Sequence, residues 1–116
     1  LEFALEEVEK LNKNFKSNLK IPETNSGLNV ELEKALRLED FIELSKLMIK
    51  DAIEREESCG AHFREEYQTE EGEAKRNDDF FSHIAVWEFN SDNNSHIRYS
   101  EELNFKKIGL NTRNYK

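Results

Sequence analysis

Cys59 and His62 form the local pair with the clearest potential for chemistry in this sequence. A thiolate and an imidazole three residues apart could ligate a metal ion, or act as a nucleophile and its base. Structural zinc sites, however, use four ligands at recognisable spacings, and this chain contains one cysteine. In the structural alternative, Gly60 ends a helix while Cys59 and His62 pack or hydrogen-bond beside it. We favour the structural interpretation.

A mixed carboxylate–histidine metal site is the second candidate, built from His62, Glu65 and Glu66 with the distant His83 and His96. The spacing differs from that of the zinc-binding helix signature, and a solvated acidic loop explains these residues better. The glycines are isolated, so the chain has no phosphate-cradling loop, and it has no Gly-x-Ser-x-Gly elbow. The residues alone therefore predict no catalytic, cofactor-binding or metal-ligating residue.

The composition excludes several kinds of partner. The chain has 116 residues, enough for one domain or part of one, with a net charge of −8 and 36% charged residues. Leu, Ile, Val and Phe make up about a quarter of it, above the roughly 20% below which chains are usually disordered. An acidic surface repels phosphates, which argues against nucleic acid and anionic lipid as partners. The single cysteine fits a reducing compartment, and the missing initiator Met leads us to expect a processed or excised chain.

Residues 1–58 are predicted to form a helical hairpin. Apolar residues recur at spacings of three and four along residues 1–19, and Pro22 then breaks the helix. A second, longer helix is expected to begin at Asn29 as its N-cap and to run to Glu57 or Ser58, where Gly60 offers a stop.

The second helix is apolar around most of its circumference, with one narrow polar stripe. Such helices are usually buried on several sides, whereas one partner helix of 19 residues covers a single side. We therefore expect either that part of the natural packing surface is missing from this chain or that the chain forms a homodimer.

Residues 59–116 are predicted to form an extended arm, a small β-hairpin and a basic tail. Residues 59–79 are rich in acids and lack periodicity, while β-branched and aromatic residues predict a strand over 83–89. A polar turn and a short partner strand over 96–99 follow. The tail carries four basic residues and no acid from position 106 onward, namely Lys106, Lys107, Arg113 and Lys116. It either floats in solvent or docks on an acidic surface.

The stretch from Leu38 to Tyr67 resembles the C-terminal domain of the flavoprotein subunit of succinate dehydrogenase and fumarate reductase. It reads LEDFIELSKLMIKDAIEREESCGAHFREEY, and its second half is similar to that family's Glu-Ser-Arg-Gly-Ala-His-x-Arg-Glu-Asp turn. Further on, Asn77-Asp78-Asp79-Phe80-Phe81 and Ala85-Val86-Trp87-Glu88 resemble the family's next segment and strand. The resemblance covers residues 28–116 well and the first helix by pattern only.

One departure is that Cys59 stands where many family members have Arg. This feature is similar to a Bacillus- and Bacteroides-type branch, in which the flavoprotein sits with a dihaem membrane anchor subunit beside an iron–sulfur subunit. The cysteine removes any contact that a guanidinium makes in other branches.

The resemblance implies a mainly α fold, a helical bundle of spectrin-repeat type with a long helical hairpin, followed by an irregular arm and a small β-hairpin. It implies a parent protein that interconverts succinate and fumarate through FAD and exchanges electrons with quinone by way of the iron–sulfur subunit. That protein would be cytoplasmic, peripheral on the inner face of the bacterial membrane through its partner subunits. The family's flavin-linking and substrate residues lie in upstream flavin and capping domains, so no catalytic residue is expected in residues 1–116.

The resemblance assigns only a docking role within this chain. Gly60, His62 and Arg64 match the family turn, and we expect them to help dock this domain on the flavin domain. From the residues alone, the alternative is a free-standing acidic helical module that binds a basic or apolar protein patch without catalysis.

Overall fold

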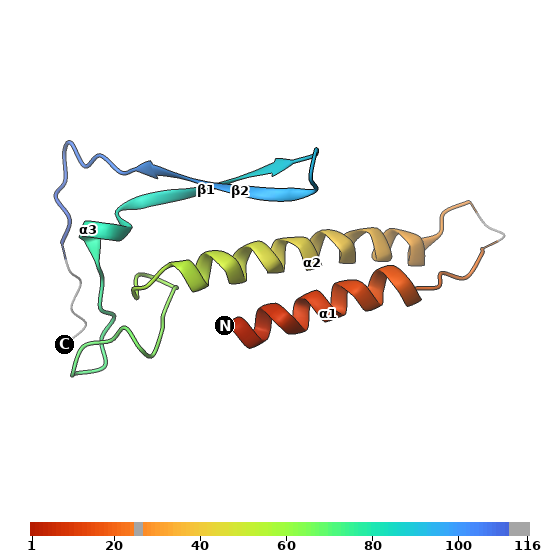
Figure 1. The fold of residues 1–116 in the computed structure, drawn as a ribbon, viewed down its shortest axis with the longest axis horizontal. Helices are drawn as coiled ribbons and strands as arrows, with labels where there is room; N and C mark the ends of the chain where they lie inside the picture. The colour runs from red at the N-terminus through yellow and green to blue at the C-terminus, as the bar shows by residue number, and fades with distance from the viewer. Residues whose placement is uncertain (25–26, 112–116) are drawn as a thin grey trace. The chain divides into compact units, whose positions relative to one another are not determined.

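The computed structural model describes residues 1–24 and 27–111. They fall into two compact units, Leu1–Glu54 and Arg55–Lys116, and each is described by itself. The fold is mainly helical with a small β-hairpin, as the sequence predicts (Figure 1). None of the helices in the described parts is both long enough and apolar enough to cross a membrane.

The first unit is a pair of helices, α1 (Glu2–Asn18) and α2 (Val30–Glu54), which lie side by side (Figure 1). The apolar spacing of α1 leaves Leu5, Val8 and Phe15 half-buried, because these side chains share the stripe that meets α2. On α2, Ala35 and Ile42 are buried, only 8% and 4% exposed. They lie seven residues apart, two helical turns, so they sit on one face.

Asn29 caps the start of α2, as the sequence predicts. Its Oδ1 accepts hydrogen bonds from the backbone N–H groups of Glu31 and Leu32, both at 3.1 Å. Its Nδ2 donates to the carbonyl of Pro22 at 3.0 Å and so ties the connecting segment to the helix start. Two of the N–H groups that a helix leaves without an internal partner are satisfied in this way. Of the turn residues that precede Asn29, positions 25 and 26 lie outside the described residues.

The predicted end of α2 is wrong by three to four residues, because the helix ends at Glu54. The N–H of Ser58 donates to the carbonyl of Lys75 at 2.9 Å instead of bonding back along a helix. Gly60 therefore does not end the helix and lies six residues beyond it. The competing bond is long-range in sequence, so no local pattern signals it.

Much of the apolar surface of the helix pair is exposed, including seven large side chains of α2. These are Val30, Leu32, Leu36, Leu38, Phe41, Leu44 and Met48. The partner helix α1 covers one side of α2, which agrees with the surplus of apolar surface that the sequence shows. Burial of α2 on several sides is not found among the described residues.

The second unit holds a loop, a one-turn helix α3 (Asp78–Phe81), and the antiparallel strands β1 (His83–Asn90) and β2 (Ser95–Glu102). The sequence did not predict α3. The loop carries two isolated bridges, Cys59 with His62 and Gln68 with Ala74. Strand β2 is longer than predicted, since its polar second half pairs with the start of β1 in the register Ile84–Glu101 and His83–Glu102. Cross-strand hydrogen bonds extend a strand beyond its own apolar residues.

Candidate domain-docking site

The turn after α2 is built around a buried carboxylate. Glu57 is 2% exposed, and its Oε1 accepts hydrogen bonds from Arg55 Nε at 2.9 Å and Nη2 at 2.6 Å. Its other oxygen, Oε2, accepts from the backbone N–H of Asn77 at 2.7 Å. A buried charge is tolerated when it is paired and hydrogen-bonded in this way. Glu57 thus joins the start of the turn to a segment twenty residues further on.

Ser58 makes the second set of internal bonds and is fully buried. Its hydroxyl donates to the carbonyl of Arg64 at 3.1 Å and accepts from the N–H of the same residue at 2.8 Å. Its own N–H donates to Lys75. One small side chain therefore closes the loop from 58 to 64, and its backbone holds that loop against residue 75.

Between these anchors the chain makes a tight reversal at Gly60. Cys59 and His62 exchange backbone hydrogen bonds, with N···O distances of 2.8 and 3.1 Å. Gly60 has a φ of +60°, a left-handed conformation that L side chains adopt at a cost. A Cβ there would meet no atom within 4 Å, so the requirement for glycine is conformational. The Cys59–His62 pair is therefore a turn held by backbone atoms.

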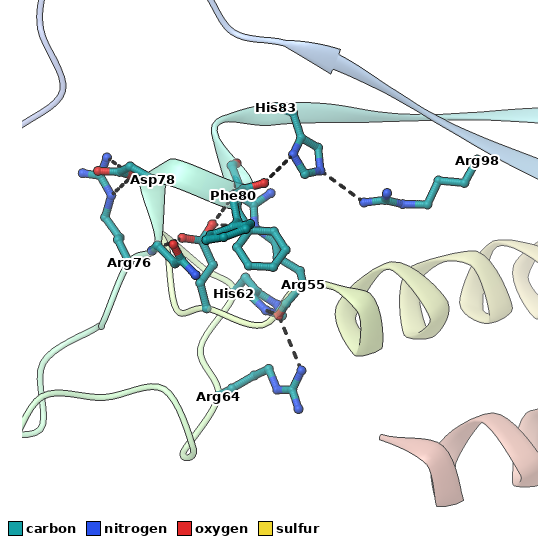
Figure 2. A network of polar contacts seen from close by, with 11 residues as sticks. Arg55, His62, Arg64, Arg76, Asp78, Phe80, His83 and Arg98 are labelled. Carbon is teal, nitrogen blue, oxygen red and sulfur yellow. Dashed lines mark hydrogen bonds and ion pairs between the residues drawn. The ribbon is translucent and has the colours of Figure 1, made fainter.

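His62 and Arg64 both reach the carbonyl of Arg55, the residue directly after α2. His62 Nε2 lies 3.0 Å from that oxygen and Arg64 Nη1 lies 3.5 Å from it, and Figure 2 shows the Arg64 contact. Because a carbonyl can only accept, His62 must carry its proton on Nε2. The cationic guanidinium of Arg64 suits this position, since a charged donor strengthens a hydrogen bond to a carbonyl.

The Arg64 side chain has further partners in the same loop. Its guanidinium lies 4.9 Å from the centre of the Tyr67 ring, and Nη2 is 3.4 Å from Glu66 Oε1. This side chain is 17% exposed. The pKa of Glu66 is held below its usual value, first by a backbone hydrogen bond and then by the bond to Arg64.

The docking role predicted for Gly60, His62 and Arg64 stays a prediction. The structure shows which of these residues are exposed and which are bonded within the second unit. The contacts of His62 and Arg64 described above run to atoms within the second unit. Between Cys59 and Arg64, the exposed positions are Gly60, Ala61 and Phe63. Phe63 is half exposed, and sequence reasoning missed it. The sequence feature that could have pointed to Phe63 is an aromatic residue between His62 and Arg64, in the turn that resembles the family.

A second polar group lies at the junction of α3 and the hairpin. His83 Nδ1 is 3.1 Å from the carbonyl of Phe80, and Arg98 Nη2 is 3.4 Å from His83 Nε2 (Figure 2). Since the carbonyl accepts and the guanidinium donates, these two contacts fit a proton on Nδ1 of His83 and a lone pair on Nε2. Arg76 binds Asp78 Oδ1 through Nε and Nη2, at 3.0 and 2.6 Å. These contacts position the strands and leave no group poised for acid–base work.

Neither a metal nor FAD fits the described residues. Within residues 1–24 and 27–111, no three His, Cys, Asp or Glu side chains come together as metal ligands. His83 and His96, suggested above as ligands to join His62, pair with other groups: His83 with Phe80 and Arg98, and His96 in ring contact with Phe89. The glycines at 27, 60, 72 and 109 stand singly, so no consecutive backbone N–H groups form a dinucleotide phosphate loop.

One protein family accounts for almost the whole sequence. The family described as "Fumarate reductase flavoprotein C-term" matches residues 1–115, and the chain belongs to it. Over 59 residues the chain is 41% identical to a protein of Methanothermobacter marburgensis that is named as one of the subunits of fumarate reductase (CoM/CoB). That match covers 51% of this chain and 11% of the relative, so the chain spans a small part of the relative's length.

Proposed function

We propose that this chain is the C-terminal structural domain of a longer flavoprotein subunit that interconverts succinate and fumarate. The observation that carries the proposal is the family match over residues 1–115. The internally bonded turn supports it, because a loop with buried Glu57 and Ser58 suits a rigid scaffold better than a reactive site. The sequence predicts a helical hairpin over residues 1–58 and an arm, β-hairpin and tail over 59–116, whereas α2 ends at Glu54 and the two compact units divide after it.

In this proposal the parent binds FAD, which supplies the redox chemistry, through its upstream flavin domain. Electrons pass between the flavoprotein and quinone through an iron–sulfur subunit, with the quinone held at a membrane anchor subunit on the cytoplasmic face of a bacterial membrane. Residues 1–116 contribute no catalytic group. Their part is to hold the flavin and capping domains in place.

The test compares the parent with residues 1–116 alone. The full-length protein should purify with FAD and reduce a dye when succinate is added, whereas residues 1–116 should do neither. FAD or succinate-dependent reduction with the short chain would contradict the scaffolding role. A gene that encodes these residues without a flavin-binding segment would instead favour the free-standing acidic interaction module.

The electron donor of the parent has two candidates. Quinol is implied by the resemblance, while the name of the M. marburgensis relative pairs its activity with CoM/CoB. Fumarate reduction by the purified complex, measured once with a quinol analogue and once with CoM and CoB, separates the two candidates. If only CoM and CoB support activity, quinone and the membrane anchor drop out of the proposal.

For the turn, we infer that Gly60 and Phe63 present the contact to the flavin domain while His62 and Arg64 hold them in place. The inference follows from exposure, since Phe63 is half exposed and Arg64 is bonded within the loop. Phe63→Ser should lower the melting temperature of the full flavoprotein and leave that of residues 1–116 unchanged. His62→Ala should lower both, because it removes an internal bond. Equal effects of Phe63→Ser on both proteins would contradict the docking role.

A further inference from the structure

The β-hairpin has an apolar face that no other described part of the second unit buries. Cross-strand partners point to the same side of a sheet, and side chains alternate along each strand. The register therefore places eight side chains on one side, here named the Val86 face: Ile84, Val86, Glu88, Asn90, Ser95, Ile97, Tyr99 and Glu101. Its four large apolar side chains are 49%, 44%, 37% and 49% exposed, for Ile84, Val86, Ile97 and Tyr99 respectively.

The opposite side of the hairpin is mixed, since Ala85, Trp87 and Phe89 from β1 stand against Ser100, Arg98 and His96 from β2. An antiparallel hairpin with one solvated side normally places polar residues on that side. The Val86 face is therefore the side expected to be covered. A two-stranded sheet is also marginal by itself in water, so the hairpin needs a covering surface.

The charges on the Val86 face limit what can cover it. Glu101 pairs with Ile84 at one end of the hairpin, and Glu88 pairs with Ile97 toward the turn, so an acid stands at each end of the apolar group. Stacking a second copy on this face would bring acids against acids in either orientation, which costs energy when they are desolvated. A surface with apolar side chains flanked by Lys or Arg complements it.

Tyr99 adds a polar feature to the same face. A side-chain hydrogen bond to Glu88 raises the pKa of the Tyr99 hydroxyl. The register places the Glu88 carboxylate on the same side as Tyr99, beside the apolar group. An incoming guanidinium or ammonium would meet this carboxylate, and such pairs form charge-assisted hydrogen bonds.

We propose that the Val86 face is a docking surface for the flavin-binding part of the same polypeptide, which presents an apolar patch flanked by basic side chains to Glu88 and Glu101. This inference rests on the proposed function, since it takes its partner from the longer flavoprotein. It assigns to the hairpin a contact separate from that of the Gly60–Phe63 turn.

Thiol labelling in the full flavoprotein tests this surface. Val86→Cys and Phe89→Cys are made in a Cys59→Ser background, and the labelling rate of each position is followed by peptide mass spectrometry. Phe89 is the matched control, because it lies in the same strand, is 57% exposed and points to the other side. Labelling at position 86 should be at least about tenfold slower in the full flavoprotein than in residues 1–116, with position 89 changed less than about twofold. Adding Glu88→Lys should restore most of the rate at position 86.

Four outcomes would overturn the assignment. Equal labelling at position 86 in both proteins means that the face is open. Slow labelling already in residues 1–116 means that the chain covers itself, and protection that grows with the concentration of that chain means a second copy. Protection that appears only when the iron–sulfur subunit is added means that another protein of the complex is the partner. FAD content and succinate-dependent dye reduction are measured on the same samples, so a failure of the proposed function is seen separately.

Discussion

The helix pair and the loop-and-hairpin unit are each stabilised internally by a different kind of interaction. Among the described residues, the side chains buried in the helix pair are apolar, Ala35 and Ile42, while those buried in the second unit are polar, Glu57 and Ser58. Apolar contacts stabilise without specifying direction. Hydrogen bonds to a buried carboxylate and hydroxyl specify which backbone atoms meet, and their loss leaves buried groups without partners.

This contrast explains how each unit could serve a larger protein. The helix pair keeps many large apolar side chains exposed and so depends on what packs against it. In the turn after α2, the buried side chains of Glu57 and Ser58 are hydrogen-bonded within the second unit, so these bonds set the shape of the turn. The two units also have distinct spectroscopic probes, since Trp87 is the single tryptophan and lies in β1 of the second unit, whereas far-ultraviolet circular dichroism reports mainly on α1 and α2.

The largest effect is expected at Glu57. Glu57→Ala leaves Arg55 and the N–H of Asn77 without their shared partner, and removing one member of a buried pair costs about 3 kcal/mol. The urea unfolding transition followed by Trp87 fluorescence should move to lower urea concentration, and the free energy of unfolding derived from it should fall by that amount. Glu65→Ala, the control at an exposed acid of the same loop, should not move it. Equal shifts of the fluorescence and dichroism transitions would show that the two units unfold together and would weaken the contrast.

Ile42 tests the helix pair in the same way. Ile42→Ala removes the most buried apolar side chain of α2 and should cost about 2 kcal/mol, the lower end for such truncations because the site is near the surface. The measurement is urea unfolding followed by dichroism at 222 nm. Leu36→Ala, on an exposed position of the same helix, should cost less than about 0.5 kcal/mol. If both cost the same, Ile42 is not the centre of the packing.

A smaller effect is expected at the cap of α2. Asn29→Ala removes the oxygen that accepts from Glu31 and Leu32 and should cost about 1 kcal/mol, the usual value of an N-cap. Asn29→Asp keeps the acceptor and should stay close to the wild type. Thermal unfolding by dichroism measures both. An alanine variant as stable as the aspartate variant would show that the cap contributes nothing.

The smallest effect is a pH dependence at Tyr99. Its pKa is raised above the ordinary 10.0 by the bond to Glu88, so the protonated hydroxyl is the form that folding favours. The stability that Tyr99 contributes is therefore complete below the unfolded-state pKa and is lost as the pH rises through the folded-state pKa. The stability difference between wild type and Tyr99→Phe should be constant near neutral pH and shrink above about pH 10. A stability difference that stays constant at all pH values would contradict the bond between Tyr99 and Glu88.

Local structure was largely predictable from the sequence. The three-and-four spacing of apolar residues predicts α1, the polar Asn29 ahead of an apolar run predicts the cap, and the alternation at 83–89 predicts β1. Each of these depends on residues within a few positions of one another. The family was also predictable, since the turn from Glu57 to Glu66 and the strand after it carry the resemblance that the family match confirms.

The position of the turn was predictable from the sequence, and its contacts were less so. The sequence points to the turn and to His62 and Arg64, but gives no sign that both reach the carbonyl of Arg55. It also overlooks Phe63, which the fold leaves half exposed. Exposure depends on where the rest of the loop runs. The basic tail stays a prediction, because Arg113 and Lys116 lie outside the described residues; Asn111, just before them, accepts a bond from Arg76 at 2.8 Å.

By itself, the sequence determined the two helices, the cap, the hairpin and the family, because these follow from periodicity and from short motifs. The tertiary structure alone decided where α2 ends, why Glu57 and Ser58 are buried and what Gly60 does. The physical reason is distance along the chain. The bonds from Glu57 to Asn77 and from Ser58 to Lys75 join residues about twenty positions apart, and they outweigh the local helical preference that continues past Glu54.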